Sequence, residues 1–218
     1  MGELLAKVLP LCIGAAISPA VLTVQLINLG GKQSPLRRAW VFVAGFFVVS
    51  VALAVLALTL VRATHAADGN DAEIGGAVKV GAGVLLLVLG VRSLTRAPKE
   101  KVAKAEHTGP RLGQAFVLGM VLMATNFSSI LLMFPAVHET GIADVSDGSK
   151  AVVIAVILCF VLAPAALPPL TVTALGARGE SAMAALDRFF AAHRQAIAAA
   201  ICFAFAVYLL ASGLPKLL

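Results

Sequence analysis

Charged side chains are scarce in this sequence. Only 13% of its 218 residues are Asp, Glu, Lys or Arg, whereas 60% are hydrophobic and the mean hydropathy is +0.98. A typical soluble domain carries about 25% charged residues and about 45 to 50% apolar ones. The chain therefore has too little charge to cover a water-facing surface, which excludes a soluble enzyme. The formal net charge of +6 does not indicate nucleic-acid binding, because excess Lys and Arg mark the cytoplasmic loops of membrane proteins.

Cysteine and the usual enzyme motifs are also lacking. The three cysteines, Cys12, Cys159 and Cys202, lie in apolar stretches without CxxC spacing, so neither a disulfide framework nor a cysteine metal site is predicted. No Gly-rich phosphate loop and no nucleophile–base pair is present. We therefore expect no enzyme activity, no ATP-driven pump and no bound cofactor.

No Asp, Glu or His falls in the middle of an apolar run. The histidines are expected in loops or at the ends of spans: His65, His107, His138 and His193. Glu139 is assigned to an acidic outer loop together with Asp144 and Asp147. Since transition metals need His, Cys or carboxylate ligands and proton relays need embedded acids or histidines, a metal site and an intramembrane proton relay are both disfavoured.

Six apolar runs are long enough to cross about 30 Å of hydrocarbon. They are 4–29, 39–61, 74–94, 113–137, 151–175 and 196–214. Twelve of the 17 basic residues fall in the first, third and fifth connections. By the positive-inside rule these connections are cytoplasmic, and both termini lie outside the cytoplasm.

The most polar connection divides the chain almost in half. We predict an all-α polytopic membrane protein with one integral membrane domain: a first three-helix repeat (1–95), a basic cytoplasmic linker (96–111) and a second three-helix repeat (112–218). Three spans per half place the second half upside down relative to the first. Such inverted repeats are the construction of many secondary transporters.

Polar residues and proline recur at mid-depth in the first and fourth spans. Ser18-Pro19 should weaken the first span near its middle, because proline removes one helical hydrogen bond. Thr125-Asn126 lies at the equivalent depth of the fourth span. The candidate substrate-binding residues are Ser18, Pro19, Gln25, Thr125, Asn126, Ser128 and Ser129. Such groups either bind substrate near the midplane or hold neighbouring helices together, and the sequence leaves both roles open.

Two further features are assigned from the residue pattern. Pro164, Pro168 and Pro169 predict a broken or strongly kinked fifth span, interpreted as a gate or as a static kink. Gly76, Gly83 and Gly90 repeat every seven residues and predict a helix-packing stripe.

Lys79 has two interpretations. It either snorkels outward or lies in the cavity, where it would bind an anionic group as an eighth candidate site residue.

Residues 178–194 contain apolar side chains at helical spacing among charged ones. This pattern predicts a short interfacial helix before the sixth span. A simple extension of that span explains it equally well.

Several segments resemble one known family. The run 13–19, the basic end of the third span at 92–96, the run 113–129 and the ending 186–213 resemble the GAP family, the peptidoglycolipid- or sulfolipid-addressing proteins of the lysine exporter (LysE) superfamily. The resemblance implies six helices in two inverted repeats and an export role. Relatives often have Asn-Pro in the fourth span; here Phe127 follows Asn126, which puts a proline-driven break there in doubt.

These features predict a secondary exporter of a small zwitterionic or amphipathic solute, an envelope glycolipid or lipid precursor being one such cargo. The alternative is a non-transporting accessory protein that assists an envelope-lipid export complex through the glycine stripe. The predicted location is the bacterial inner membrane. The expected partners are membrane lipids and the cargo, with no nucleic acid; a homo-oligomer or a larger export complex is left open.

Overall fold

The polypeptide is almost entirely helical in the ranges described by a computed structural model, residues 2–30, 34–68, 71–95 and 111–216, and no strand occurs in these ranges. The helices are α1 (Gly2–Ala16), α2 (Pro19–Leu29), α3 (Pro35–Asp68), α4 (Asp71–Thr95), α5 (Leu112–Ala124), α6 (Phe127–Ile142), α7 (Asp147–Leu175), α8 (Ala177–Gly213) and the short 3-10 helix η1 (Leu214–Lys216). The all-α prediction is confirmed for these ranges. The predicted linker 96–111 lies outside the described residues, apart from Arg111.

Large apolar side chains cover much of the outer surface of the helices. Val55, Leu56 and Leu60 on α3 are each at least half exposed, and Val88 and Val91 on α4 are as well. Soluble proteins rarely expose contiguous apolar patches of this extent. The helices are therefore those of a multi-pass membrane protein, whose outer faces contact hydrocarbon.

Four helices contain a continuous stretch long and apolar enough to span a membrane: 35–63 in α3, 73–95 in α4, α7, and 196–213 in α8. Two further candidates are bent pairs. α1 and α2 meet at 51°, and α5 and α6 meet at 64°. The described part of the chain thus has four to six spans, and it has six if each bent pair crosses as one broken span.

The first break follows from the covalent geometry of proline. Pro19 is the first residue of α2 and has no N–H, and Ser18 before it is extended, with φ −129° and ψ 92°. A residue before proline avoids the helical region for steric reasons. The chain therefore leaves the helix at Ser18 and begins a new one at Pro19.

The second break forms without a proline. Asn126 has φ −83° and ψ 69° and precedes α6, which begins at Phe127. Tight backbone hydrogen bonds replace the helical pattern, from Asn126 N to Met123 O (3.1 Å) and from Phe127 N to Thr125 O (3.0 Å). Asparagine tolerates such non-helical conformations because its short side chain competes for backbone partners.

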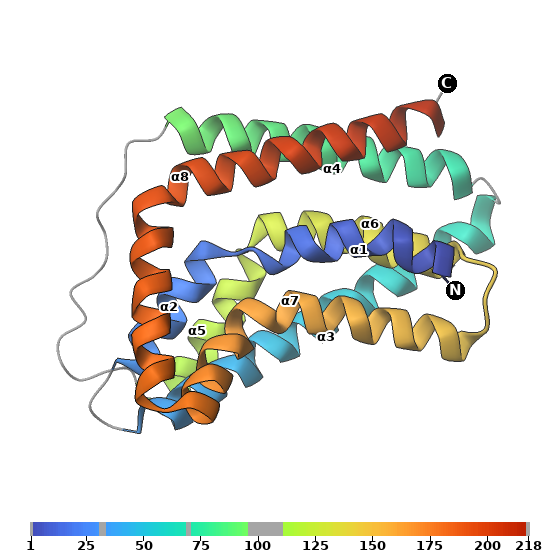
Figure 1. The fold of residues 1–218 in the computed structure, drawn as a ribbon. Coiled ribbons are helices and arrows are strands. Elements are labelled where there is room, and N and C mark those ends of the chain that lie inside the picture. The colour runs from blue at the N-terminus through green and yellow to red at the C-terminus, as the bar shows by residue number, and fades with distance from the viewer. Residues whose placement is uncertain (1, 31–33, 69–70, 96–110, 217–218) are drawn as a thin grey trace.

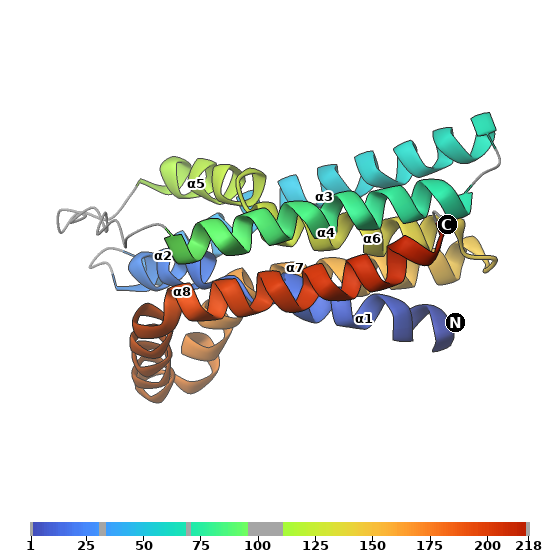
Figure 2. The same ribbon diagram turned by 90° about the horizontal axis from the view of Figure 1, so that it is seen from above.

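Helices far apart in the sequence lie side by side. α4 runs along α8, and α3 runs along α5 (Figures 1 and 2). α1 runs along α6, so the first half of one bent pair packs on the second half of the other. The N-terminus and the C-terminus lie at the same end of the bundle (Figure 1).

Glycines bring helix backbones into direct contact. A Cβ built on Gly83 would lie 3.0 Å from Leu210 Cγ, and one built on Gly90 would lie 3.1 Å from Cys202 Cβ. Both neighbours belong to α8. Gly76 is buried, and its carbonyl lies against Gly213 of α8. The stripe of Gly76, Gly83 and Gly90 therefore faces α8 within the chain.

The three prolines of the fifth span do not divide it. α7 is one helix from Asp147 to Leu175 with Pro164, Pro168 and Pro169 inside it, so of the two predicted forms, a broken or a strongly kinked span, the broken one is absent. Its last turns run in a different direction from its first turns (Figures 1 and 2). The prolines thus kink α7 without ending it.

Residues 178–194 are predicted to form an interfacial helix or an extension of the sixth span, and α8 has features of both. It is one helix from Ala177 to Gly213, yet it turns sharply between its first and second halves (Figure 1). The first half runs across the direction of the spans, as an interfacial helix would.

Candidate functional site

The two breaks meet through their side chains. Asn126 Nδ2 donates a hydrogen bond to Ser18 Oγ over 3.3 Å. Ser128 Oγ in turn donates to Asn126 Oδ1 over 3.1 Å. The structure therefore brings together three of the predicted site residues, of which Asn126 lies 108 positions after Ser18 in the chain.

Ser129 compensates for the missing N–H of Pro19. In a continuous helix the carbonyl of Ala15 would accept from the N–H of residue 19, which is proline. Ser129 Oγ, from the other bent pair, donates to Ala15 O over 2.9 Å instead. Ser129 is 1% exposed, so the bond satisfies a carbonyl that water does not reach.

Gln25 compensates for Pro169 in the same manner. The carbonyl of Ala165 has no helical donor because Pro169 lacks an N–H. Gln25 Nε2 donates to Ala165 O over 2.6 Å and to Ala39 O over 3.1 Å. Gln25 is fully buried, and in this conformation its amide ties α2 to both α3 and α7.

A rescue experiment tests this compensation. Gln25→Leu should destabilise the protein by about 1–3 kcal/mol, because it leaves the buried Ala165 carbonyl without a donor. Pro169→Ala restores the helical N–H, so adding it to Gln25→Leu should recover part of that loss. Thermal unfolding of the purified variants in detergent measures both effects. If Pro169→Ala lowers the stability of Gln25→Leu further, the assigned compensation is wrong.

The remaining polar candidate bonds to its own helix. Thr125 is exposed, and its Oγ1 donates to Val121 O (2.8 Å) and Leu122 O (3.3 Å). These bonds satisfy the end of α5. Thr125 thus lies beside the paired breaks but makes no bond to the other bent pair.

Lys79 lies in a buried ion pair. Lys79 Nζ is 2.6 Å from Glu139 Oε1, and the two side chains are 11% and 8% exposed. The lysine therefore does not snorkel into water, and a carboxylate already balances its charge. The pair joins α4 to α6.

The assignment of His138 and Glu139 to a loop or span end is corrected by the structure. Both residues belong to α6, which continues to Ile142, and they are 5% and 7% exposed. The helix continues because the segment after Pro135 contains no strong breaker before Gly141. A lysine inside a span needs a counter-charge, and this was the signal in the sequence from which the pairing with Glu139 could have been found. No group of three His, Cys, Asp or Glu that could hold a metal ion occurs among the described residues.

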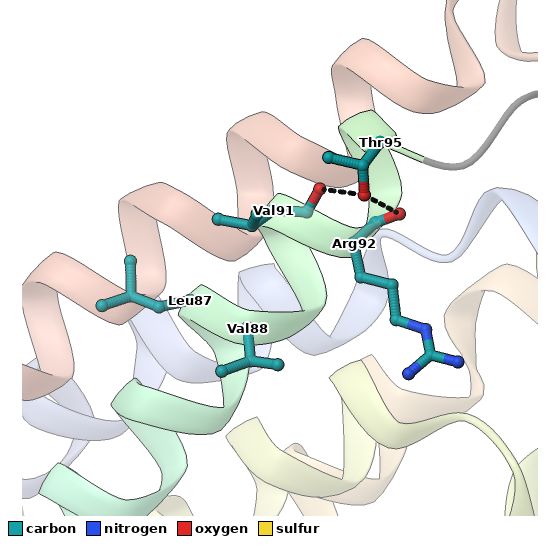
Figure 3. Close-up of a pocket in the computed structure, with 5 residues that line it drawn as sticks. All are labelled: Leu87, Val88, Val91, Arg92 and Thr95. Atoms are coloured by element: carbon teal, nitrogen blue, oxygen red, sulfur yellow. Dashed lines mark hydrogen bonds between the residues drawn. The ribbon is translucent and has the colours of Figure 1, made fainter.

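A shallow groove lies at the last turns of α4. Leu87, Val88, Val91, Arg92 and Thr95 line it, and its volume is about 380 Å³ (Figure 3). Thr95 Oγ1 donates to Val91 O (3.1 Å) and Arg92 O (3.4 Å). The groove combines an apolar floor with one guanidinium, and none of the predicted site residues lines it.

Comparison with known proteins gives one match. No curated protein and no solved structure matches the chain. The family described as Sap, sulfolipid-1-addressing protein, matches residues 8–215, which is nearly the whole chain. The predicted resemblance to the sulfolipid-addressing proteins is thereby confirmed, and the chain belongs to the sulfolipid-1-addressing protein family.

Proposed function

We propose that the protein is an exporter of an amphipathic envelope lipid or a lipid precursor, built as six spans in two inverted repeats. Its family is described by the addressing of sulfolipid-1, a lipid. The observation that carries the proposal is the hydrogen bond between Asn126 and Ser18, which joins two broken helices. Broken helices that meet near the bilayer centre are the binding sites of many secondary transporters.

The packing pattern supports the inverted repeats. α2 packs against α3, α7 and α8, whereas α6 packs against α7, α3 and α4. If α1, α2, α3 and α4 are exchanged in order with α5, α6, α7 and α8, then α2 takes the place of α6. The three neighbours of α2 then become these three neighbours of α6. An internal two-fold relationship explains this exchange.

The packing of α1 on α6 is one of the contacts that depart from the two-fold pattern. α1 packs along α6, but no comparable packing joins the equivalent helices α5 and α2 in the described part of the chain. α1 and α6 are thus packed on one another, whereas α2 and α5 are not. In alternating access, a transporter closes one of two equivalent ends and opens the other. We assign this conformation to the state that opens toward α2 and α5.

The open end carries the basic residues. The groove with Arg92 lies there, at the end of α4, and in the sequence most basic residues belong to the first, third and fifth connections. The positive-inside rule makes this end cytoplasmic and puts both termini outside the cytoplasm. Cargo would then enter from the cytoplasmic leaflet, with its apolar part along Leu87, Val88 and Val91 and its polar part near Arg92.

The test uses purified protein in vesicles that contain a fluorescent sulfated glycolipid. Its movement between leaflets is followed by chemical quenching from one side. Ser18→Ala combined with Asn126→Ala should reduce the initial rate about tenfold, which corresponds to losing one hydrogen-bonded anchor. Thr59→Val on α3 is the matched control, because Thr59 is exposed and bonds only to Leu56 O of its own helix. An unchanged rate in a folded double variant would reject the site.

The same experiment distinguishes the exporter from the alternative, an accessory protein that does not transport. An accessory protein would need a docking face, and the glycine stripe suggested for it is occupied by α8. Movement of the fluorescent lipid by the wild-type protein alone would exclude a purely accessory role. Absence of movement, together with co-purification of a larger export component, would favour it.

A further inference from the structure

Arg38 is a buried cation near the start of α3. Its side chain is 4% exposed. Its one side-chain hydrogen bond runs from Nη2 to Asn28 O and is long, at 3.4 Å. The Nε atom is buried and has no hydrogen-bond partner among the residues that the structure describes. No carboxylate forms an ion pair with Arg38 in the described part of the chain.

Asn28, beside Arg38, also has an unused polar atom. It is 1% exposed, and its Nδ2 donates to Gln25 Oε1 over 3.2 Å. Its Oδ1, an acceptor, is buried, and no described residue donates a hydrogen bond to it. The positively charged donor of Arg38 and the neutral acceptor of Asn28 therefore lie close together between α2 and α3.

Burial of this guanidinium calls for an anion. Arginine stays protonated in proteins, so it cannot relieve its desolvation by losing a proton as a buried lysine can. A buried charge without a partner is destabilising. The first turn of α3 adds backbone N–H groups and the positive end of the helix dipole, both of which favour an anion at this place.

Trp40 places this cluster at the depth of lipid headgroups. It is the only tryptophan of the chain, it follows Arg38 by two residues on α3, and it is 40% exposed. Tryptophan is enriched at the membrane–water interface. The anions available at that depth are the esters of lipid headgroups.

We propose that Arg38, Asn28 and the first turn of α3 bind the sulfate or phosphate ester of an anionic lipid headgroup. The fork of the guanidinium matches two oxygens of such a tetrahedral anion. Asn28 Oδ1 accepts a hydrogen bond from a neighbouring hydroxyl, so a headgroup that also carries a sugar or polyol is favoured. The inference builds on the proposed function, since it names the charge of the cargo lipid, but binding is measured without any transport.

Trp40 supplies the signal for the test. Wild-type protein in neutral nanodiscs is titrated with brominated phosphatidic acid, and separately with brominated phosphatidylcholine, while quenching of Trp40 is recorded. The wild type should bind the anionic lipid about tenfold more tightly than the zwitterionic one, as expected for a charge-assisted hydrogen bond. Arg38→Gln should abolish this preference. Arg37→Gln removes an exposed charge from the same turn and should retain it.

Competition identifies the source of the oxyanion. Sodium sulfate that releases the brominated lipid from the wild type, where chloride at the same ionic strength does not, would show that a free oxyanion also fits the site. Retention of the lipid in both salts would assign binding to the headgroup together with its membrane. Equal loss of preference in Arg37→Gln and Arg38→Gln, or no loss in either, would overturn the proposal.

A stability measurement guards against misfolding. In a non-ionic detergent without anionic lipid, Arg38→Gln should unfold at the same or a higher temperature than the wild type, because it removes an unpaired buried charge. Added phosphatidic acid should raise the unfolding temperature of the wild type but not of the variant. If Arg38→Gln does not fold, Arg38→Lys is used instead, because it keeps the charge but lacks the forked guanidinium. Arg38→Lys should bind the anionic lipid more weakly than the wild type does. Equal binding would contradict the assigned geometry. Lipid binding without transport would leave this site intact and reject the exporter.

Discussion

Replacing Glu139 by Gln should lower the stability of the purified protein by about 3–5 kcal/mol. The substitution keeps the shape of the side chain but leaves Lys79, whose side chain is 11% exposed, without the carboxylate 2.6 Å away. A buried charge that loses its partner is destabilising because neither water nor another group replaces it. Thermal unfolding in detergent, followed by the loss of monodisperse protein on size exclusion, measures the effect.

Two companion variants isolate the charge as the cause. Glu139→Gln combined with Lys79→Met removes both charges and should regain most of the stability, since apolar replacements of buried ion pairs are often neutral. Asp144→Asn is the matched control, because Asp144 is exposed two residues after the end of α6, and we expect no change. A double variant as unstable as Glu139→Gln alone would mean that other contacts of Glu139 dominate.

Gly119→Ala should be more disruptive than its single added carbon suggests. A Cβ at Gly119 on α5 would overlap Phe42 O of α3, and a Cβ at Gly45 on α3 would overlap Phe116 O of α5. The obstructing atoms belong to backbone, which cannot rotate away. Overpacking in a core costs about 1–3 kcal/mol when side chains can adjust, so we expect at least the upper part of this range and a sharp fall in the yield of folded protein.

Gly81→Ala is the control for this prediction. Gly81 lies in α4 and has nothing within 4 Å of a built Cβ. Alanine in an exposed helix is more stable than glycine by about 0.5–1 kcal/mol, so this variant should unfold at the same or a higher temperature. If Gly119→Ala and Gly81→Ala behave alike, α3 and α5 do not touch through these glycines.

Proline affects this fold in two ways: its ring restricts the backbone, and its missing N–H leaves a carbonyl group without a helical donor. Pro19 and Pro169 each deprive a carbonyl four residues earlier of its helical donor, and a distant polar side chain replaces it in each case: Ser129 for Ala15 and Gln25 for Ala165. These bonds connect separate helices. They explain why α7 bends without breaking, since its freed carbonyl at Ala165 is already satisfied.

The sequence by itself was sufficient for features that depend on local properties. Apolar runs located the helices, because crossing hydrocarbon requires a minimum length of apolar chain. Ser18-Pro19 located the first break, because the clash before proline is a property of two adjacent residues. The polar cluster around Asn126 located the second break, although its missing proline had put that break in doubt.

Only the tertiary structure decided which polar groups meet. Asn126 and Ser18 are separated by 108 positions and Gln25 and Ala165 by 140. The buried pairing of Glu139 with Lys79 was missed because charge and hydropathy patterns assign an acid near the end of a span to water. The energy of a polar group inside a membrane protein depends on the partner that folding brings to it, and that partner comes from a distant part of the chain.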